Sequence, residues 1–329
     1  MNYTNSTNFV AFPEFKVYRH GYIFQIWGCL TTILIAMVAF FGNLAVIVVS
    51  FREEKLRTQI GNFLIVFLSS VDVVTSIFVM IPSAIAMAAD AWPFGVFICK
   101  VNATFNYGLS CASSHTAAMI SLDRALAIVY PLKYQTIMTS KVMIGIFTWV
   151  LSNTAFCMVL ALSLLYTITY DYNEAICAGA FSEYKTKLFF YVASSSCFVL
   201  PATIIVICNT IILRQIRKSS SVTPRQIISK GTNDFDYNMR RRKDVEMRKS
   251  VYSMMVVIIV YFIYFAPYTF TKQGKSISDI DAPPWLNYVS TLMMFISSAT
   301  NPFIYGILRK DYRDGFKKIY RLLKEKLHF

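Results

Sequence analysis

The chain has 329 residues, of which 56% are hydrophobic, 16% aromatic and only 15% charged. A soluble globular domain carries about 45–50% apolar and about 25% charged residues, so this composition excludes an ordinary soluble protein. The formal net charge of +14 would suit a nucleic-acid-binding protein, but the basic residues are confined to segments between apolar runs. That distribution is typical of a protein that lies in a membrane and faces anionic lipid, and we expect no nucleic-acid partner.

Seven apolar stretches are long enough to cross a bilayer, which takes about 20 mostly apolar residues in a helix. Because these runs are continuous and lack the alternation of lipid-facing strands, they predict helices rather than a β-barrel. The expected spans are residues 22–50, 60–89, 97–129, 142–166, 187–213, 250–271 and 285–308. We therefore predict an all-α membrane protein with a seven-transmembrane helix bundle over residues 22–308.

The distribution of Lys and Arg predicts the orientation, because cytoplasmic loops carry an excess of both. With the N-terminus outside, 25 of the 32 basic residues fall on the cytoplasmic side. The sequons at Asn2 and Asn5 agree with this orientation, since glycan addition needs a luminal segment. We expect residues 1–21 to be extracellular and to carry glycans, and we expect a plasma-membrane location.

Two further segments are predicted on the cytoplasmic side. Residues 214–249 are basic and polar and predict a flexible third cytoplasmic loop. In the tail, residues 309–329, apolar and basic side chains occupy opposite faces, which predicts a short amphipathic helix on the inner leaflet, in contact with membrane lipids. The apolar face holds Tyr312, Phe316, Ile319, Tyr320 and Leu323.

Polar residues inside the spans are the first functional signal. An ionisable group at mid-bilayer costs about 2.5–3.5 kcal/mol on insertion scales, so each one is a functional hypothesis. Asp72 lies near the middle of the second span, Asn43 lies in the first, and Asn301 precedes Pro302 in the seventh. One interpretation is that these residues hold the bundle together by interhelical hydrogen bonds. Alternatively, Asp72 could hold a cation or a proton in a wet cavity.

Cysteine positions separate into two groups. Cys99 opens the third span and Cys177 lies in the outer loop between spans four and five, so both face an oxidising compartment and predict a disulfide. The other five cysteines fall inside spans and are interpreted as small apolar residues. These five are Cys29, Cys111, Cys157, Cys197 and Cys208. His115 is interpreted as a neutral packing residue, with a ligand-binding or pH-sensing role as the alternative.

These features together resemble the rhodopsin-like (class A) family of G-protein-coupled receptors, over nearly the whole chain. The most specific anchors are Asp72, the Asp123-Arg124 pair that closes the third span, and the NPxxY pattern from Asn301 to Tyr305. Further anchors are Gly42-Asn43, Ser69, Trp149, Pro201 and Pro267. The resemblance implies a receptor, not an enzyme, that binds an extracellular ligand and activates heterotrimeric G proteins.

The resemblance also implies roles for particular residues. Arg124 is expected to pair with Asp123 at rest and to contact the G protein in the active state. Pro267 is expected to kink the sixth helix, the element that swings outward, while Tyr305 moves inward. A sodium ion is the one allosteric cofactor implied, held by oxygen donors. Its site would comprise Asp72, Ser113, Ser297, Ser298 and Asn301.

The chain departs from the family pattern at several positions. Ala125 follows Arg124 where the family has an aromatic residue, Phe265 replaces the sixth-span Trp, and Met247 replaces the acidic residue that restrains Arg124. We therefore expect a weaker restraint of the resting state. No Ser or Thr follows Pro302, so a receptor kinase and arrestin would act on the hydroxyls of the third loop.

Two ligand classes are disfavoured by position. Asn106 stands where aminergic receptors carry an Asp, and Phe295 stands where opsins carry the retinal Lys, so the chain resembles neither a typical aminergic receptor nor an opsin. The expected ligand cavity is mostly aromatic, which favours a small neutral or amphipathic molecule, or a peptide. Its expected lining is Asn106, Tyr107, Cys111, Phe265, Tyr268, Thr269, Thr291 and Phe295.

The alternative function is a membrane transporter or channel that uses Asp72 in an ion path. The sequence has no evident internal repeat and a single acid deep in the spans, and both observations disfavour a transporter built from two related halves. Substrate flux without nucleotide exchange on a G protein would identify this alternative.

Overall fold

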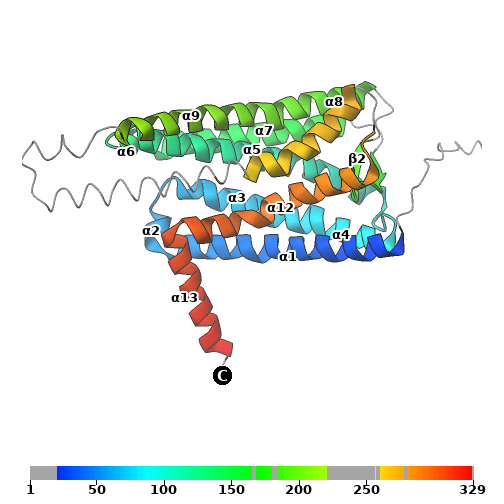
Figure 1. Cartoon of the computed structure of the whole chain (residues 1–329), viewed down its shortest axis with the longest axis horizontal. Coiled ribbons are helices and arrows are strands. Elements are labelled where there is room, and N and C mark those ends of the chain that lie inside the picture. The colour runs from blue at the N-terminus through cyan, green and yellow to red at the C-terminus, as the bar shows by residue number, and fades with distance from the viewer. Residues whose placement is uncertain are drawn as a thin grey trace, which may run out of the picture.

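The computed structural model describes residues 21–164, 168–179, 184–220, 256, 260–277 and 281–327. The described chain is a bundle of long helices packed lengthwise, with a short β-hairpin at one end and a helix that leaves the bundle at the other (Figure 1). We call these the disulfide end, which carries Cys99 and Cys177, and the Arg124 end, which carries Arg124.

Several of the predicted spans are divided into consecutive helical pieces. The first is α1 (Tyr22–Arg52), and the second consists of α3 (Asn62–Thr75), the π-helix η1 (Ser76–Met80) and α4 (Ile81–Ala89). The third is α5 (Gly95–Val129) and the fourth is α7 (Ser140–Leu164). The fifth consists of α8 (Tyr184–Ser194), the π-helix η2 (Ser195–Val199) and α9 (Leu200–Ser220). The sixth is described as helix at residue 256 and over residues 260–277, and the seventh is α12 (Pro284–Leu308).

Shorter elements join these helices. They are α2 (Glu54–Arg57), α6 (Tyr134–Ile137), β1 (Ile168–Asp171), β2 (Ile176–Gly179) and the C-terminal α13 (Lys310–Leu327). Among the described residues, the helices over 22–52, 62–89, 140–163 and 184–215 are each long and apolar enough to cross a membrane. α12 and α13 pass the same criterion only as a pair, bent by 96° at the break between them. α5 packs against α3, α7 and α9, and a helix surrounded by protein can carry more polar residues than one that faces lipid.

Two features were not part of the sequence prediction. In the connection between the fourth and fifth spans of the predicted helical bundle, β1 and β2 form an antiparallel hairpin in which Ile168 pairs with Gly179 and Asp171 with Ile176. α9 also extends past residue 214, the predicted start of the third loop, since Arg, Gln and Lys are good helix formers. The remainder of that loop, residues 221–249, lies outside the described residues, as do Asn2 and Asn5.

Tyr312 anchors α13 to the bundle. Its side chain is completely buried, its hydroxyl donates to Asn62 Oδ1 at 2.6 Å, and the same hydroxyl lies 2.7 Å from Ser50 Oγ. Two residues of the predicted apolar face of α13, Phe316 and Ile319, pack against the buried apolar cluster that contains Tyr312. A third, Tyr320, is 69% exposed. The polar anchor, which the apolar pattern alone did not predict, holds α13 against α1 and α3.

Replacing Tyr312 by Phe should destabilise the protein, because the ring is kept while Asn62 Oδ1 loses its donor. A buried group left without its hydrogen bond costs about 1–3 kcal/mol. We expect Tyr312→Phe to lower the melting temperature of the purified protein, measured by thermal unfolding in detergent. The exposed Tyr320→Phe is the matched control and should melt like the wild type. Equal melting temperatures for both variants would show that this network does not hold α13.

Candidate functional site: ligand cavity and inner ion pair

A cavity lies among the helices near the disulfide end. Its lining is Asn106, Tyr107, Ser110, Cys157, Phe190, Ala193, Ser194, Cys197, Phe198, Phe265, Tyr268, Thr269, Lys272 and Met294. The structure therefore places five of the eight predicted residues in the lining: Asn106, Tyr107, Phe265, Tyr268 and Thr269. The other three, Cys111, Thr291 and Phe295, are buried but do not line this cavity. Aromatic rings dominate the wall, as is typical of small-molecule sites.

Polar atoms in this lining are incompletely hydrogen-bonded. Asn106 Nδ2 and Oδ1, the Tyr107 hydroxyl and the Tyr268 hydroxyl are buried and make no hydrogen bond of ordinary geometry among the described residues, although Tyr268 lies beside Asn106 and Tyr107 beside the Gly179 backbone. Buried polar atoms are nearly always paired in folded proteins, so each one needs an explanation. A ligand that both donates and accepts hydrogen bonds would satisfy them.

A buried ion pair closes the cavity toward the hairpin. Lys272 Nζ donates to Glu174 Oε1, and the two side chains are only 4% and 5% exposed. The Lys272 ammonium also lies 5.4 Å from the ring centroids of Phe190 and Tyr268. Burial raises the pKa of the Glu174 carboxyl, and the positive charge of Lys272 opposes that rise. The two charges neutralise one another, which leaves the cavity without a net charge from this pair.

Neither member of this pair was among the predicted site residues. In the sequence, Glu174 lies between the predicted fourth and fifth spans, and Lys272 directly follows the predicted sixth span. A signal was present, because Lys272 follows Tyr268 by four residues and therefore lies on the same helical face. Its partner Glu174 lies in a hairpin and not on a helix, so helical spacing could not predict the contact.

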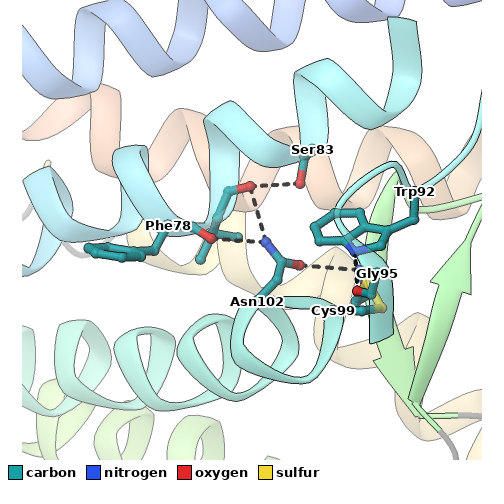
Figure 2. The surroundings of a disulfide bond; sticks show 8 residues. Phe78, Ser83, Trp92, Gly95, Cys99 and Asn102 are labelled. Atoms are coloured by element: carbon teal, nitrogen blue, oxygen red, sulfur yellow. Dashed lines mark hydrogen bonds between the residues drawn. A yellow bond between two sulfur atoms is a disulfide. The ribbon is translucent and has the colours of Figure 1, made fainter. Parts of the chain in front are cut away.

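The hairpin that carries Glu174 is fixed by covalent and polar contacts (Figure 2). Cys99 and Cys177 form a disulfide, which confirms the predicted pairing. The backbone N–H of Cys177 donates to Asn102 Oδ1 at 3.3 Å, and Asn102 Nδ2 donates to the Phe78 carbonyl at 3.0 Å. Phe78 lies in η1, where the wider π-helical turn leaves a carbonyl available to a side chain. The hairpin thus has a fixed position over the cavity.

Asp72 meets the seventh span midway along the bundle. The carboxylate is completely buried, and Asn301 Nδ2 donates to its Oδ2 at 2.7 Å. Oδ1 has no hydrogen-bond partner within the described chain, although Ser298 lies beside it. Asn43 Nδ2 donates to the Ser298 carbonyl at 3.0 Å, so the first span joins the same network. An ideal Cβ on Gly42 would lie 2.8 Å from Pro302, which explains why a glycine precedes Asn43.

This oxygen-rich cluster suits a hard cation such as sodium. The structure brings together three of the five residues predicted for that site, Asp72, Ser298 and Asn301. Ser297 is buried on the same helix and Ser113 is half-buried on α5, but no hydrogen bond between either and Asp72 is found among the described residues. The unpartnered Asp72 Oδ1 and the unpartnered, buried Ser69 Oγ are the atoms that a cation would satisfy.

At the Arg124 end, Arg124 Nη2 lies 2.8 Å from Asp123 Oδ2, the pair that the family resemblance implied. Tyr134 donates its hydroxyl proton to Asp123 Oδ1 at 2.6 Å, a contact that the sequence did not predict. Burial raises the pKa of Tyr134, and the neighbouring Asp123 raises it further, so the phenol stays a neutral donor. Tyr305 is buried, with its ring centroid 5.7 Å from that of Tyr312. Pro267 lies within the helix over residues 260–277.

Comparison with known proteins agrees with this arrangement. Residues 42–305 match the family described as 7 transmembrane receptor (rhodopsin family). The octopamine receptor beta-1R of Drosophila melanogaster is 27% identical over 90% of this chain, which spans 61% of that receptor's length. Galanin receptor 2b of Danio rerio is 26% identical over 89% of this chain and 74% of its own length. Squid rhodopsin superposes with a TM-score of 0.78 at 17% identity, covering 92% of this chain and 86% of that chain.

A seven-transmembrane helix bundle with a C-terminal helix is therefore the class of protein that the fold defines. Because the match covers most of the sequence, the chain belongs to the rhodopsin family of seven-transmembrane receptors. It is a multi-pass membrane receptor of the G-protein-coupled class, and the family does not favour the transporter or channel alternative.

Proposed function

We propose that the protein is a receptor whose extracellular ligand binds in the cavity below the hairpin and whose Arg124 end activates a heterotrimeric G protein. The single observation that supports this most strongly is the pairing of an aromatic cavity at one end with the Asp123–Arg124 ion pair at the other. In a two-state receptor, each ligand shifts the population by its differential affinity for the two states, and the coupling between the two sites is reciprocal.

The proposed ligand is a small molecule without net charge, or the end of a peptide, that both donates and accepts hydrogen bonds. Asn106, Tyr107 and Tyr268 would supply the polar contacts, because their buried polar atoms make no hydrogen bond of ordinary geometry among the described residues. The Glu174–Lys272 pair adds no net charge. The two relatives described above are named as receptors for different ligands, octopamine and galanin, so their names do not select a ligand for this chain.

The polar cluster midway along the bundle would act as the allosteric element of this switch. Asp72, Ser298 and Asn301 would hold the sodium ion, with Ser297 and Ser113 as the predicted additional donors. A bound cation would favour whichever state keeps these oxygens together. Pro267 and Tyr305 would change position when the receptor passes from that state to the other. The predicted extracellular N-terminus, and phosphorylation of the third loop followed by arrestin binding, belong to the same proposal.

The test is a ligand screen against a panel of chimeric G proteins, with nucleotide exchange as the readout. We expect an uncharged, polar–aromatic ligand to raise exchange in the wild type, and Arg124→Ala to abolish the response at equal surface expression. We expect Asn106→Ala to reduce the potency of that ligand by at least about tenfold, since a lost buried hydrogen bond costs about 1–3 kcal/mol. Undiminished signalling by Arg124→Ala would contradict the proposed coupling, and unchanged potency in Asn106→Ala would contradict the proposed cavity.

A further inference from the structure

Three free cysteines, far apart in the sequence, meet in the structure. Cys111 comes from α5, Cys157 from α7 and Cys197 from η2, and their sulfur atoms all lie within 4.8 Å of one another. The Sγ atoms of Cys157 and Cys197 are 3.6 Å apart. The sequence interpretation of these residues as small apolar side chains does not explain why three thiols from three helices converge on one point.

The spacing of the sulfur atoms suits a thiolate-bound metal ion. Zn–S bonds are about 2.3 Å long, so two sulfurs at adjacent corners of a tetrahedral site lie about 3.8 Å apart. The separation between Cys157 and Cys197 is already close to that value. Soft thiolate ligands select zinc and similar ions over hard cations such as sodium or magnesium. The cluster is therefore chemically distinct from the oxygen donors around Asp72.

His115 borders the cluster as a neutral neighbour. His115 Nδ1 lies 3.4 Å from Cys111 Sγ and 2.9 Å from the Cys111 carbonyl, while its buried Nε2 has no partner in the described part of the chain. A divalent ion bound by two thiolates carries no net charge, which matters because burying a net charge is costly. The remaining sulfur and the imidazole would then act as neutral neighbours of the ion.

The cluster can also be reached, because Cys157 and Cys197 line the ligand cavity. A metal ion could enter from that cavity, and the protons released by two thiols could leave through it. The π-helical turn of η2 contributes to this geometry, since a wider turn changes which side chains face the bundle interior.

We propose that Cys111, Cys157 and Cys197 form a binding site for a thiolate-preferring divalent metal ion such as Zn²⁺, in the wall of the ligand cavity. The bound ion would link α5, α7 and η2. This site goes beyond the signalling function, and it can be tested by metal binding alone, so its failure would leave the proposed receptor function untouched.

The test uses the full-length receptor in phosphatidylcholine nanodiscs with a non-thiol reductant, titrated with Cd²⁺ as a spectroscopic substitute for Zn²⁺. We expect a saturable cadmium–thiolate charge-transfer absorbance that Zn²⁺ displaces. Each single Cys→Ser change in the cluster should raise the Cd²⁺ concentration needed for half-saturation, because it removes one of the three sulfurs that surround the ion, and the triple Ser variant should lose the absorbance. Cys29→Ser and Cys208→Ser remove free cysteines outside the cluster and should leave it unchanged. No saturable absorbance, or one that the triple Ser variant retains, would overturn the proposal.

A second readout needs no substitution and is therefore independent of any folding defect. In the wild type, Cd²⁺ should slow the reaction of Cys157 and Cys197 with a small thiol reagent by at least about tenfold, because thiolates bound to metal do not react freely. Mass spectrometry measures this residue by residue, with Cys29 as the internal control. Equal reaction rates with and without Cd²⁺ would also overturn the proposal.

Discussion

Glu174→Gln is expected to lower the melting temperature of the ligand-free receptor well below that of the wild type. The substitution keeps the shape of the side chain but removes the negative charge that Glu174 places against the buried Lys272 ammonium. Breaking a buried ion pair by removing one partner typically costs about 3–5 kcal/mol, against about 0–1 kcal/mol for an exposed pair. Thermal unfolding of the purified protein in detergent measures the difference.

The neighbouring exposed pair supplies the matched control. Lys275 and Asp281 also form an ion pair at the disulfide end, but the Asp281 side chain is 66% exposed. Asp281→Asn should therefore leave the melting temperature nearly unchanged. The exchanged pair Glu174→Lys with Lys272→Glu should recover part of the lost stability, since it restores opposite charges. If Glu174→Gln melted no lower than Asp281→Asn, the pair would not fasten the hairpin to the sixth helix.

Much of the fold was predictable because its signals are local. A transmembrane helix is encoded by one continuous apolar run, so the spans could be located from sequence alone. The contact between Asp72 and Asn301 did not come from a local signal, because only the resemblance to the receptor family placed both residues in one site. The Asp123–Arg124 pair is adjacent in sequence and needed no tertiary information.

The features that were missed depend on which side chains face one another across helices. Two π-helical segments interrupt the second and fifth spans. Because a π-helical turn is wider, the residues after it face a different direction from the one that a regular period of 3.6 residues predicts. The convergence of Cys197 with Cys111 and Cys157 therefore could not be read from helical spacing. The Glu174–Lys272 pair joins a loop to a helix, and the position of that loop is set by a disulfide and by Asn102.

Gly61→Ala is expected to raise signalling in the absence of ligand. A Cβ at this position would lie 2.6 Å from Asp123 Oδ2 and 2.7 Å from Arg124 Nη2, closer than the 3.0 Å that real Cβ atoms keep. Both the Asp123 carboxylate, which is buried and accepts a hydrogen bond from Tyr134, and the flexible end of Arg124 must therefore shift. Gly61 has ordinary right-handed helical angles, so Ala adds no backbone strain, and the effect should come from the disturbed Asp123–Arg124 pair.

The expected size of the increase follows from the restraint that is lost. Weakening the resting state by about 1.4 kcal/mol multiplies the ratio of active to resting receptor by about ten. Basal nucleotide exchange on the best-coupled G protein should therefore rise by up to about tenfold in Gly61→Ala. Gly145→Ala is the matched control, because a Cβ at Gly145 meets nothing within 4 Å. The double variant Gly61→Ala/Arg124→Ala should be silent, since Arg124 is needed for coupling. Basal exchange equal to that of Gly145→Ala would show that the Asp123–Arg124 pair does not restrain the receptor.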